Sequence, residues 1–198
     1  PAAPLAARSP EPVAQSTIDE IAELLLGDEP VALFVGGRAC RAEALADASR
    51  VVNHTSKKLL AETFPARLER GAGRTPVDRL AYLAEFAAMQ LDGLRHLVVV
   101  DSKSPVSFFA YPGKASDLVP EGCTVHVLAT GGHDVAGALS ALADAVGAPA
   151  DCATVQDGFR PELPTGPLTA EGVCQALGAL MPENAIISDE GNTSGLFA

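Results

Sequence analysis

Three glycine-containing segments have residue types that could bind a phosphate or place a catalytic group, and each follows an apolar run. In the first, Gly36, Gly37 and Arg38 end the run 31–37, where glycines let backbone amides approach a phosphate beside the next helix. Glu62, at the end of the second run, could meet a ribose hydroxyl. The segment reads GGRACR rather than GxGxxG, and a tight turn needs glycine with or without a ligand. A nucleotide site and an ordinary turn therefore both stay open.

The second segment, GGHD at 131–134, could hold an anion or place a titrating histidine. A turn followed by a helix cap from Asp134 explains the same residues equally well. The other histidines, His54, His96 and His126, lie in or beside apolar elements without a partner at a catalytic spacing. We therefore expect them to be structural or surface residues.

The third segment, DEGNTSG at 189–195, follows the apolar run 185–189. Open α/β sheets place their ligands beyond the carboxyl ends of their strands, where this loop is predicted to lie. Its small residues, amide and two hydroxyls suit a phosphate, although they also suit an ordinary polar turn.

Other motifs of catalysis and metal binding are missing from the sequence. It has no GxSxG, Walker loop or HExxH, and the cysteines at 40, 123, 152 and 174 form no CxxC pair. We therefore predict no catalytic residue and no metal site in this chain. We expect the cysteines to be small buried residues in a reducing compartment.

Composition excludes several classes of protein. With 198 residues, 47% of them hydrophobic, the chain can bury a substantial core. Its 25 acidic and 14 basic residues give a net charge of −11, which argues against nucleic acid or an anionic membrane as partner. No apolar run reaches the ~18 residues of a membrane span, and the first residues do not read as a signal peptide. We expect a soluble, cytoplasmic protein.

Helical and strand patterns alternate along the chain and predict an α/β fold. This fold is a Rossmann-like parallel sheet with helices on both faces, over residues 15–148. The predicted helices are 18–26, 41–52, 75–91 and 133–147, and the predicted strands are 31–37, 58–64, 96–101 and 123–130.

Residues 1–14 are rich in proline and alanine and predict a linker, and 149–167 lack periodicity and predict an interdomain linker. In 168–198, a helix with Thr169 as N-cap precedes a turn, the strand 185–189 and a polar loop. A helix and a single strand cannot complete a sheet. We therefore expect 168–198 to be a helix-strand stub, the truncated start of a second α/β domain.

Three stretches resemble one protein family: LLAETFPARLERGAGR at 59–74, SPVSFFAYPGKAS at 104–116, and residues 168–195. They are similar to thiamine-diphosphate-dependent decarboxylases and carboligases, in the branch of acetolactate synthase large subunit-like proteins close to benzoylformate decarboxylase. The resemblance covers nearly the whole chain, and FFAYPGK is its most specific part. It implies that 15–148 is the family's central domain and that 168–198 begins its thiamine-diphosphate-binding domain.

The resemblance implies thiamine diphosphate and Mg²⁺ as cofactors of a parent enzyme, with a 2-oxo acid as its substrate. In this family the cofactor attacks the 2-oxo acid, and its ring accepts the electrons as CO₂ leaves. The family's activating glutamate and its GDG…N metal motif have no counterpart in this sequence. We therefore expect a fragment of a decarboxylase or carboligase that is not catalytically competent by itself.

Some residues of the third segment match family positions that contact the diphosphate. Gly191, Asn192 and Thr193 match contacting positions, and Glu190 and Ser194 are weaker matches. The resemblance thus implies a diphosphate contact from this loop.

The resemblance also bears on flavin and on assembly. The segment 102–114 is unlike the flavin-type pattern, so FAD is not expected. The family forms dimers or tetramers, which implies a homodimer or homotetramer for the intact protein. Phe108, Phe109 and Tyr111 then lie either at a domain or subunit interface or in the core.

Two alternatives remain open. The chain could be a stand-alone nucleotide-binding module that uses Gly36, Gly37 and Glu62, which leaves residues 168–198 unexplained. It could also be a structural Rossmann-like module without catalysis, and residues 15–148 alone do not separate this from the main hypothesis.

Overall fold

The structure is a computed structural model that describes residues 9–191 and 194–197. It divides into two units, residues 1–156 (unit 1) and 157–198 (unit 2), which are described separately. The division falls inside the segment 149–167 that the sequence predicts as a linker. No helix of the described residues is long and apolar enough to cross a membrane.

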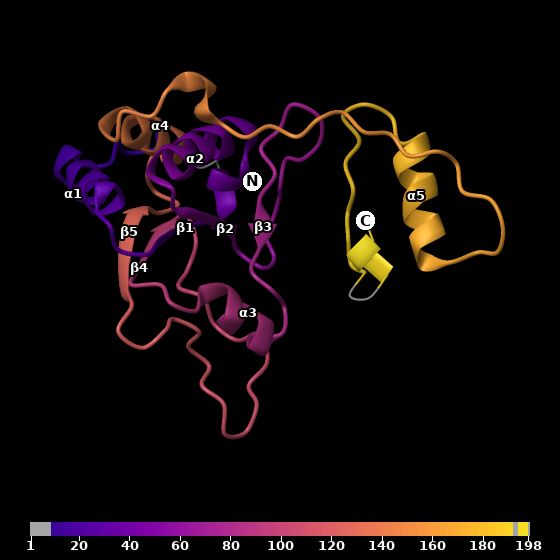
Figure 1. The fold of residues 1–198 in the computed structure, drawn as a ribbon, viewed down its shortest axis with the longest axis horizontal. Helices are drawn as coiled ribbons and strands as arrows, with labels where there is room; N and C mark the ends of the chain where they lie inside the picture. The colour runs from indigo at the N-terminus through magenta and orange to yellow at the C-terminus, as the bar shows by residue number, and fades with distance from the viewer. Residues whose placement is uncertain (1–8, 192–193, 198) are drawn as a thin grey trace, which may run out of the picture. The chain divides into compact units, whose positions relative to one another are not determined.

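Unit 1 contains one parallel sheet of five strands in the order β3-β2-β1-β4-β5 (Figure 1). All five residues of β1 are buried, as expected of a central parallel strand covered on both faces. In its register Phe34 lies beside Leu60 of β2 and Val99 of β4. The strands are β1 (Val31–Val35), β2 (Lys58–Ala61), β3 (Asp78–Arg79), β4 (His96–Val100) and β5 (Thr124–Ala129).

Helices cover both faces of this sheet. On one face, α1, α2 and α4 pack against side chains such as Leu33 and Val98. On the other face, Leu91 of α3 packs with Phe34 and Leu97. The α/β fold with a Rossmann-like parallel sheet is thereby confirmed. The helices are α1 (Gln15–Leu26), α2 (Ala42–Thr55), α3 (Ala84–Leu91) and α4 (Val135–Ala145), with short 3₁₀ turns η1 (Gly37–Cys40) and η2 (Ala150–Cys152).

The predicted helix over 75–91 is wrong in its first half. Residues 78–79 form β3, and the Leu80 amide donates a hydrogen bond to the Ala61 carbonyl at 2.8 Å. The Gln90 side chain accepts from the Ala81 amide at 2.7 Å, so α3 begins only at Ala84. Pairing with the edge of the sheet therefore outweighs the local helical pattern.

The start of the predicted linker 149–167 is bound to α2 of unit 1. Asn53 donates to the Cys152 carbonyl at 2.6 Å, and the Thr154 amide donates to Ser49 Oγ at 2.9 Å. Arg50 donates to the Pro149 carbonyl at 3.1 Å. These contacts are polar, which is why this stretch has no apolar periodicity.

Unit 2 contains α5 (Ala170–Leu180) and the 3₁₀ turn η3 (Ser194–Phe197). Thr169 is the N-cap of α5, as predicted, because its Oγ1 accepts from the Gly172 amide at 3.0 Å. Residues 185–189 are not assigned to a strand, contrary to expectation. A strand needs a partner for its backbone groups, and no described residue pairs with this segment.

Candidate functional site

The Gly36–Gly37 turn lies at the carboxyl end of β1, between the ends of β2 and β4. A Cβ on Gly36 would lie 2.6 Å from Oε1 of Glu62, and one on Gly37 would lie 2.5 Å from Oδ2 of Asp101. Gly37 also has a φ of +45°, in the left-handed region that favours glycine. The two glycines are therefore required by the close approach of two carboxylates of the chain itself.

Those carboxylates accept the hydrogen bonds that the turn could offer to a phosphate. The Gly37 amide donates to Glu62 Oε1 at 3.0 Å, and the Arg38 amide donates to Asp101 Oδ2 at 2.7 Å. Asp101 was not predicted from the sequence, although its place after β4, at a φ of +49°, is typical of a loop aspartate. A phosphate would have to displace both carboxylates to bind these amides.

Arg38 joins the first two glycine segments of the sequence. Its guanidinium donates to the carbonyls of Gly131 and His133, the latter at 3.0 Å, and its Nε lies 3.6 Å from Asp101 Oδ2. The structure thus brings the turns 36–38 and 131–134 together at the carboxyl ends of the strands.

The segment 131–134 forms a turn and a helix cap. Asp134 is the N-cap of α4, and its Oδ1 accepts from the Gly137 amide at 3.1 Å. The Thr130 amide donates to Nδ1 of His133 at 3.1 Å, which makes that nitrogen an acceptor. The His133 ring is therefore held within its own turn.

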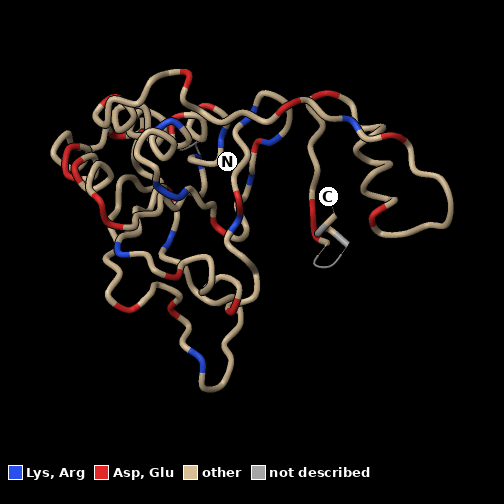
Figure 2. Tube along the Cα trace, viewed as in Figure 1, with Lys and Arg blue, Asp and Glu red and all other residues tan. Residues whose placement is uncertain are grey.

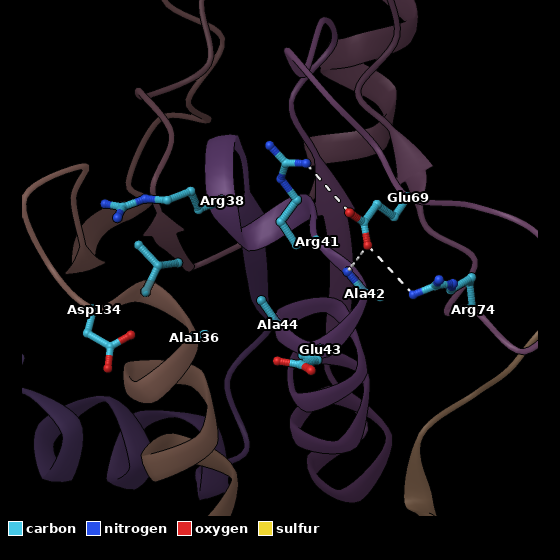
Figure 3. Close-up of a pocket in the computed structure, with 10 residues that line it drawn as sticks. Arg38, Arg41, Ala42, Glu43, Ala44, Glu69, Arg74, Asp134 and Ala136 are labelled. Atoms are coloured by element: carbon cyan, nitrogen blue, oxygen red, sulfur yellow. Dashed lines mark hydrogen bonds and ion pairs between the residues drawn. The ribbon is translucent and has the colours of Figure 1, made fainter. Parts of the chain in front are cut away.

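An open hollow of about 520 Å³ lies beside these turns (Figure 3). Arg38, Arg41 and Arg74 line it together with the first residues of α2 and α4, so three cations and two helix N-termini face one space. Glu43, Glu69 and Asp134 also line it and balance the three arginines.

Glu69 organises this hollow, and the sequence analysis did not identify it. Its Oε2 accepts from the Ala42 amide at 3.0 Å, in the first turn of α2. Its carboxylate lies 3.5 Å from Arg41, 3.2 Å from Arg67 and 3.6 Å from Arg74. The hydrogen bond from Ala42, aided by the arginines, lowers the pKa of Glu69. An acid between arginines in RLERGAGR is the sequence signal that could have found it.

Two of the histidines, in the first half of β4 and of β5, contact each other toward the amino-terminal ends of these strands. Nδ1 of His96 lies 3.0 Å from Nε2 of His126, and Nε2 of His96 lies 2.8 Å from Oε2 of Glu29. Burial, and secondarily the neighbouring His96, lowers the pKa of His126. His96 and His126 therefore do have partners, which lie 30 and 67 residues away in the sequence and were not anticipated from it.

Of the four cysteines, which were all expected to be buried, only Cys40 is, while Cys123, Cys152 and Cys174 are half-buried. Cys40 is buried, and its burial raises the pKa of the thiol to about 12. Burial also raises the pKa of Cys123. Among the described residues, no group of three or more His, Cys, Asp or Glu side chains is placed to hold a metal ion.

The third segment lies in unit 2 and curls around Asp189. The Gly191 amide donates to Asp189 Oδ1 at 2.8 Å, and a Cβ on Gly191 would lie 2.9 Å from the Gly195 nitrogen. Glu190 is exposed, and Ser194 begins η3. The predicted contacts Asn192 and Thr193 lie outside the described residues.

The residues of unit 2 do not by themselves fit a diphosphate. The Gly191 amide already donates to a carboxylate, and residues 157–198 contain six acidic side chains and one basic side chain, Arg160. Arg160 donates to the carbonyls of Ala179 and Met181 at 3.0 and 2.9 Å. A diphosphate bound here would need cations from elsewhere.

Comparison with known proteins bears on the family. No family model matches the chain. It is 52% identical over 194 residues to a Mycobacterium tuberculosis protein named as acetolactate synthase large subunit IlvX, which matches 97% of this chain and 37% of that protein. The resemblance to thiamine-diphosphate-dependent enzymes is confirmed. The chain spans about 37% of the length of this curated relative.

Solved structures of such enzymes have the same fold at low sequence identity. A thiamin diphosphate-dependent enzyme from Mycobacterium smegmatis matches with a TM-score of 0.63 and 18% identity, covering 93% of this chain and 38% of that one. The 4-hydroxybenzoylformate decarboxylase of Rhodococcus jostii matches with a TM-score of 0.61 and 20% identity, and the match covers 92% of this chain and 37% of that one. The benzoylformate decarboxylase of Polynucleobacter necessarius matches with a TM-score of 0.57 and 18% identity, and the match covers 94% of this chain and 38% of that one.

Proposed function

We propose that this chain is part of a thiamine-diphosphate-dependent enzyme that resembles the large subunit of acetolactate synthase and acts on a 2-oxo acid. The observation that supports this best is the 52% identity to IlvX along 97% of the chain. Unit 1 would be the central domain, and unit 2 would be the start of the diphosphate-binding domain. The reaction would be a decarboxylation or a carboligation, and the chain alone would be inactive.

The incomplete character of unit 2 supports the proposed inactivity. Its α5 has no buried residue, and its apolar side chains line an open groove of about 680 Å³. Further residues in the longer enzyme would cover this groove. In the longer enzyme, Gly191, Asn192 and Thr193, with Glu190 and Ser194, would lie against the diphosphate, while Mg²⁺ and most of its ligands would come from outside this chain.

The carboxylates of unit 1 support a structural role for the central domain, without FAD. Glu62 and Asp101 accept from the amides of the glycine turn, Glu69 accepts from the start of α2, and Asp134 caps α4. At all four places a carboxylate of the chain itself accepts from a backbone amide that could otherwise donate to a phosphate. Flavin absorbance in the purified longer enzyme would contradict this part of the proposal.

The test of the function uses the longer enzyme that contains this chain. With thiamine diphosphate and Mg²⁺, it should consume a 2-oxo acid from a panel that includes pyruvate and benzoylformate. An aldehyde product indicates decarboxylation, and an acyloin or a 2-hydroxy-3-oxo acid product indicates carboligation. Failure with every 2-oxo acid, in protein that binds the cofactor, would contradict the proposal.

The loop residues have a separate test in the same enzyme. Asn192→Ala and Thr193→Val should each raise the thiamine diphosphate concentration needed for half-maximal activity about tenfold, the usual effect of losing a hydrogen bond to a charged group. Glu183→Gln, in the same unit, is the control and should change nothing. Equal effects of all three variants would remove these residues from the site.

A second candidate, a nucleotide-binding module, is favoured only by the arginine-lined hollow. Calorimetric titration of the 198-residue chain with ADP decides between the two candidates. We expect no binding, because Glu69 already interacts with Arg41, Arg67 and Arg74. Saturable binding that Arg41→Ala abolishes would favour the module.

A further inference from the structure

His96 and His126 lie on neighbouring strands and on the same face of the sheet. In the parallel register of β4 and β5, His96 pairs with Thr124, and His126 pairs with Val98. Because side chains alternate between the two faces along a strand, the two rings are diagonal neighbours on one face. Val98 belongs to the core that α1, α2 and α4 cover, whereas both rings are half-buried. The pair is therefore fixed by the core and still reachable from solvent.

The contact of His96 with Glu29 determines which ring nitrogen of His96 carries the hydrogen. Nε2 of His96 lies 2.8 Å from Oε2 of Glu29, and this hydrogen bond lowers the pKa of Glu29. The carboxylate is therefore ionised at neutral pH and can only accept. In the neutral His96 ring, Nε2 then carries the hydrogen and Nδ1 has a free lone pair. That Nδ1 lies 3.0 Å from Nε2 of His126.

This is the arrangement that metal-binding histidines usually have. A ligating histidine commonly donates its second ring N–H to a carboxylate, which orients the ring and makes the ligating nitrogen more basic. His96 makes this contact with Glu29. Burial lowers the pKa of His126, so its ring is neutral at neutral pH. When its hydrogen moves to Nδ1, Nε2 of His126 becomes a second ligand without a change of charge.

The distance between the two nitrogens indicates the kind of ion. Imidazole nitrogens bind such ions at about 2.0–2.1 Å, so two of them at a right angle are roughly 2.9 Å apart, and at a tetrahedral angle roughly 3.3 Å. The observed 3.0 Å is closer to the right angle, which Cu²⁺ and Ni²⁺ prefer, once both rings turn toward the ion. Among the described residues no set of three His, Cys, Asp or Glu is placed to hold a metal ion, so water would fill the remaining positions.

The charges near the pair favour a cation. Residues 15–29, which form α1 and the turn after it, carry five acidic residues and no basic one (Figure 2). Two of these acids interact with the pair, Glu29 through its hydrogen bond and Glu20 through its charge. Arg95, which interacts with Glu29, and Lys57, which donates to the Glu29 carbonyl, offset only part of this charge. A divalent cation therefore meets a net negative surrounding.

We propose that His96 and His126 form a binding site for one divalent transition-metal ion of the Cu²⁺ or Ni²⁺ type, with Glu29 as the residue that positions His96. The site lies in unit 1 and does not depend on the proposed enzymatic function. No metal-binding motif announces it in the sequence, because its two ligands come from different strands and are 30 residues apart.

The first test is calorimetric titration of the 198-residue chain, without an affinity tag, with Ni²⁺. We expect one Ni²⁺ per chain, displacement of Ni²⁺ by Cu²⁺, and no binding of Mg²⁺ at this site, because imidazole nitrogens favour Cu²⁺ over Ni²⁺ and Mg²⁺ prefers oxygen ligands. His96→Ala and His126→Ala should each abolish the binding, and His54→Ala, at an exposed position, is the matched control and should leave it unchanged. Absence of saturable binding, or binding that survives both ligand variants, would overturn the proposal.

The second test concerns Glu29, whose side chain is 65% exposed and whose replacement should not disturb folding. Glu29→Gln should weaken Ni²⁺ binding about tenfold, as is usual when the carboxylate behind a ligating histidine is lost. Glu23→Gln, at an exposed position of α1, removes the same charge and should weaken it much less. Equal weakening by the two variants would reduce the role of Glu29 to its charge and would contradict the proposed positioning of His96.

The third test observes the ligands directly. Pulsed electron paramagnetic resonance of the chain with one equivalent of Cu²⁺ should detect the remote ring nitrogens of two bound imidazoles. His126→Gln should leave the signal of one imidazole, and melting temperatures measured without metal check that this variant folds. A spectrum without imidazole signals, or one that His126→Gln does not alter, would place the copper ion elsewhere and overturn the proposal.

Discussion

Phe34 and Leu142 of unit 1 are at most 1% exposed, whereas Leu168 and Ile186 of unit 2 are 89% and 88% exposed. Both units contain long apolar side chains, but only unit 1 has elements on both sides of a sheet to cover them. Burial of such side chains is the main source of stability in a folded domain. We therefore expect unit 1 to be stable by itself and unit 2 to need further residues to bury its apolar side chains.

Separating the two units tests this comparison with the largest expected effect. Residues 1–156 should unfold in one cooperative thermal transition, because they contain the whole buried core. Residues 157–198 should show no cooperative transition, since α5 buries no residue. Circular dichroism during heating measures both. A cooperative transition of residues 157–198 by themselves would contradict the expectation that unit 2 is not stable alone.

Single substitutions at a buried position of unit 1 and an exposed position of unit 2 should differ in their effect on stability. Phe34→Ala should lower the free energy of unfolding by about 3–5 kcal/mol, because it leaves a cavity between β1 and α3. Leu177→Ala, at a position 56% exposed, should change it by less than about 0.5 kcal/mol. Urea unfolding followed by circular dichroism measures both. Comparable losses at the two positions would mean that α5 is buried in solution.

Glu69 tests whether polar contacts also stabilise unit 1. Glu69→Ala should cost about 1 kcal/mol, as for loss of an acceptor at a helix N-terminus. Glu69→Gln keeps an acceptor and should cost less. Because the pKa of Glu69 is lowered in the fold, its contribution is present above its unfolded pKa and is lost as pH falls through the folded one. Acid unfolding of both variants should lack this component, and an unchanged acid transition would contradict the role of Glu69.

The histidine pair predicts the smallest effect. The pKa of His126 is lowered in the fold, so the unfolded chain binds a proton more readily. The contribution of His126 to the free energy of unfolding should therefore be fully present above the ordinary histidine pKa of about 6.5, and it should decline as pH falls below that value. Melting temperatures between neutral and mildly acidic pH measure this. His126→Gln should flatten the dependence in that range, and an unaltered slope would assign it to other groups.

The sequence predicted the parts of the fold in which local pattern and tertiary contacts agree. The strand at 31–35 is apolar and buried throughout, the strand at 96–100 is so after His96, and α2 and α4 have regular apolar spacing. The helix 75–91 failed because β3 depends on pairing with β2, which no local pattern reveals. The strand predicted at 123–130 also matches β5 to within one residue at each end, so the error lies in the two-residue strand β3.

The candidate site was predictable only in part. Glycine turns are visible in the sequence, so Gly36, Gly37 and the segment 131–134 were identified. Their acceptors Glu62 and Asp101 are 25 and 63 residues away from the amides that they bind. Only Glu62 was singled out from the sequence, and then as a possible contact to a ribose hydroxyl. Long-range pairing of a carboxylate with an amide leaves no local pattern, which is also why Glu69 was missed.

The most direct test compares thiamine diphosphate binding by the 198-residue chain and by the longer enzyme that contains it, with Mg²⁺ present, in a calorimeter. We expect the longer enzyme to bind the cofactor, while the 198-residue chain shows no heat of binding even though unit 1 is folded. Binding by the 198-residue chain, or none by the longer enzyme, would contradict it.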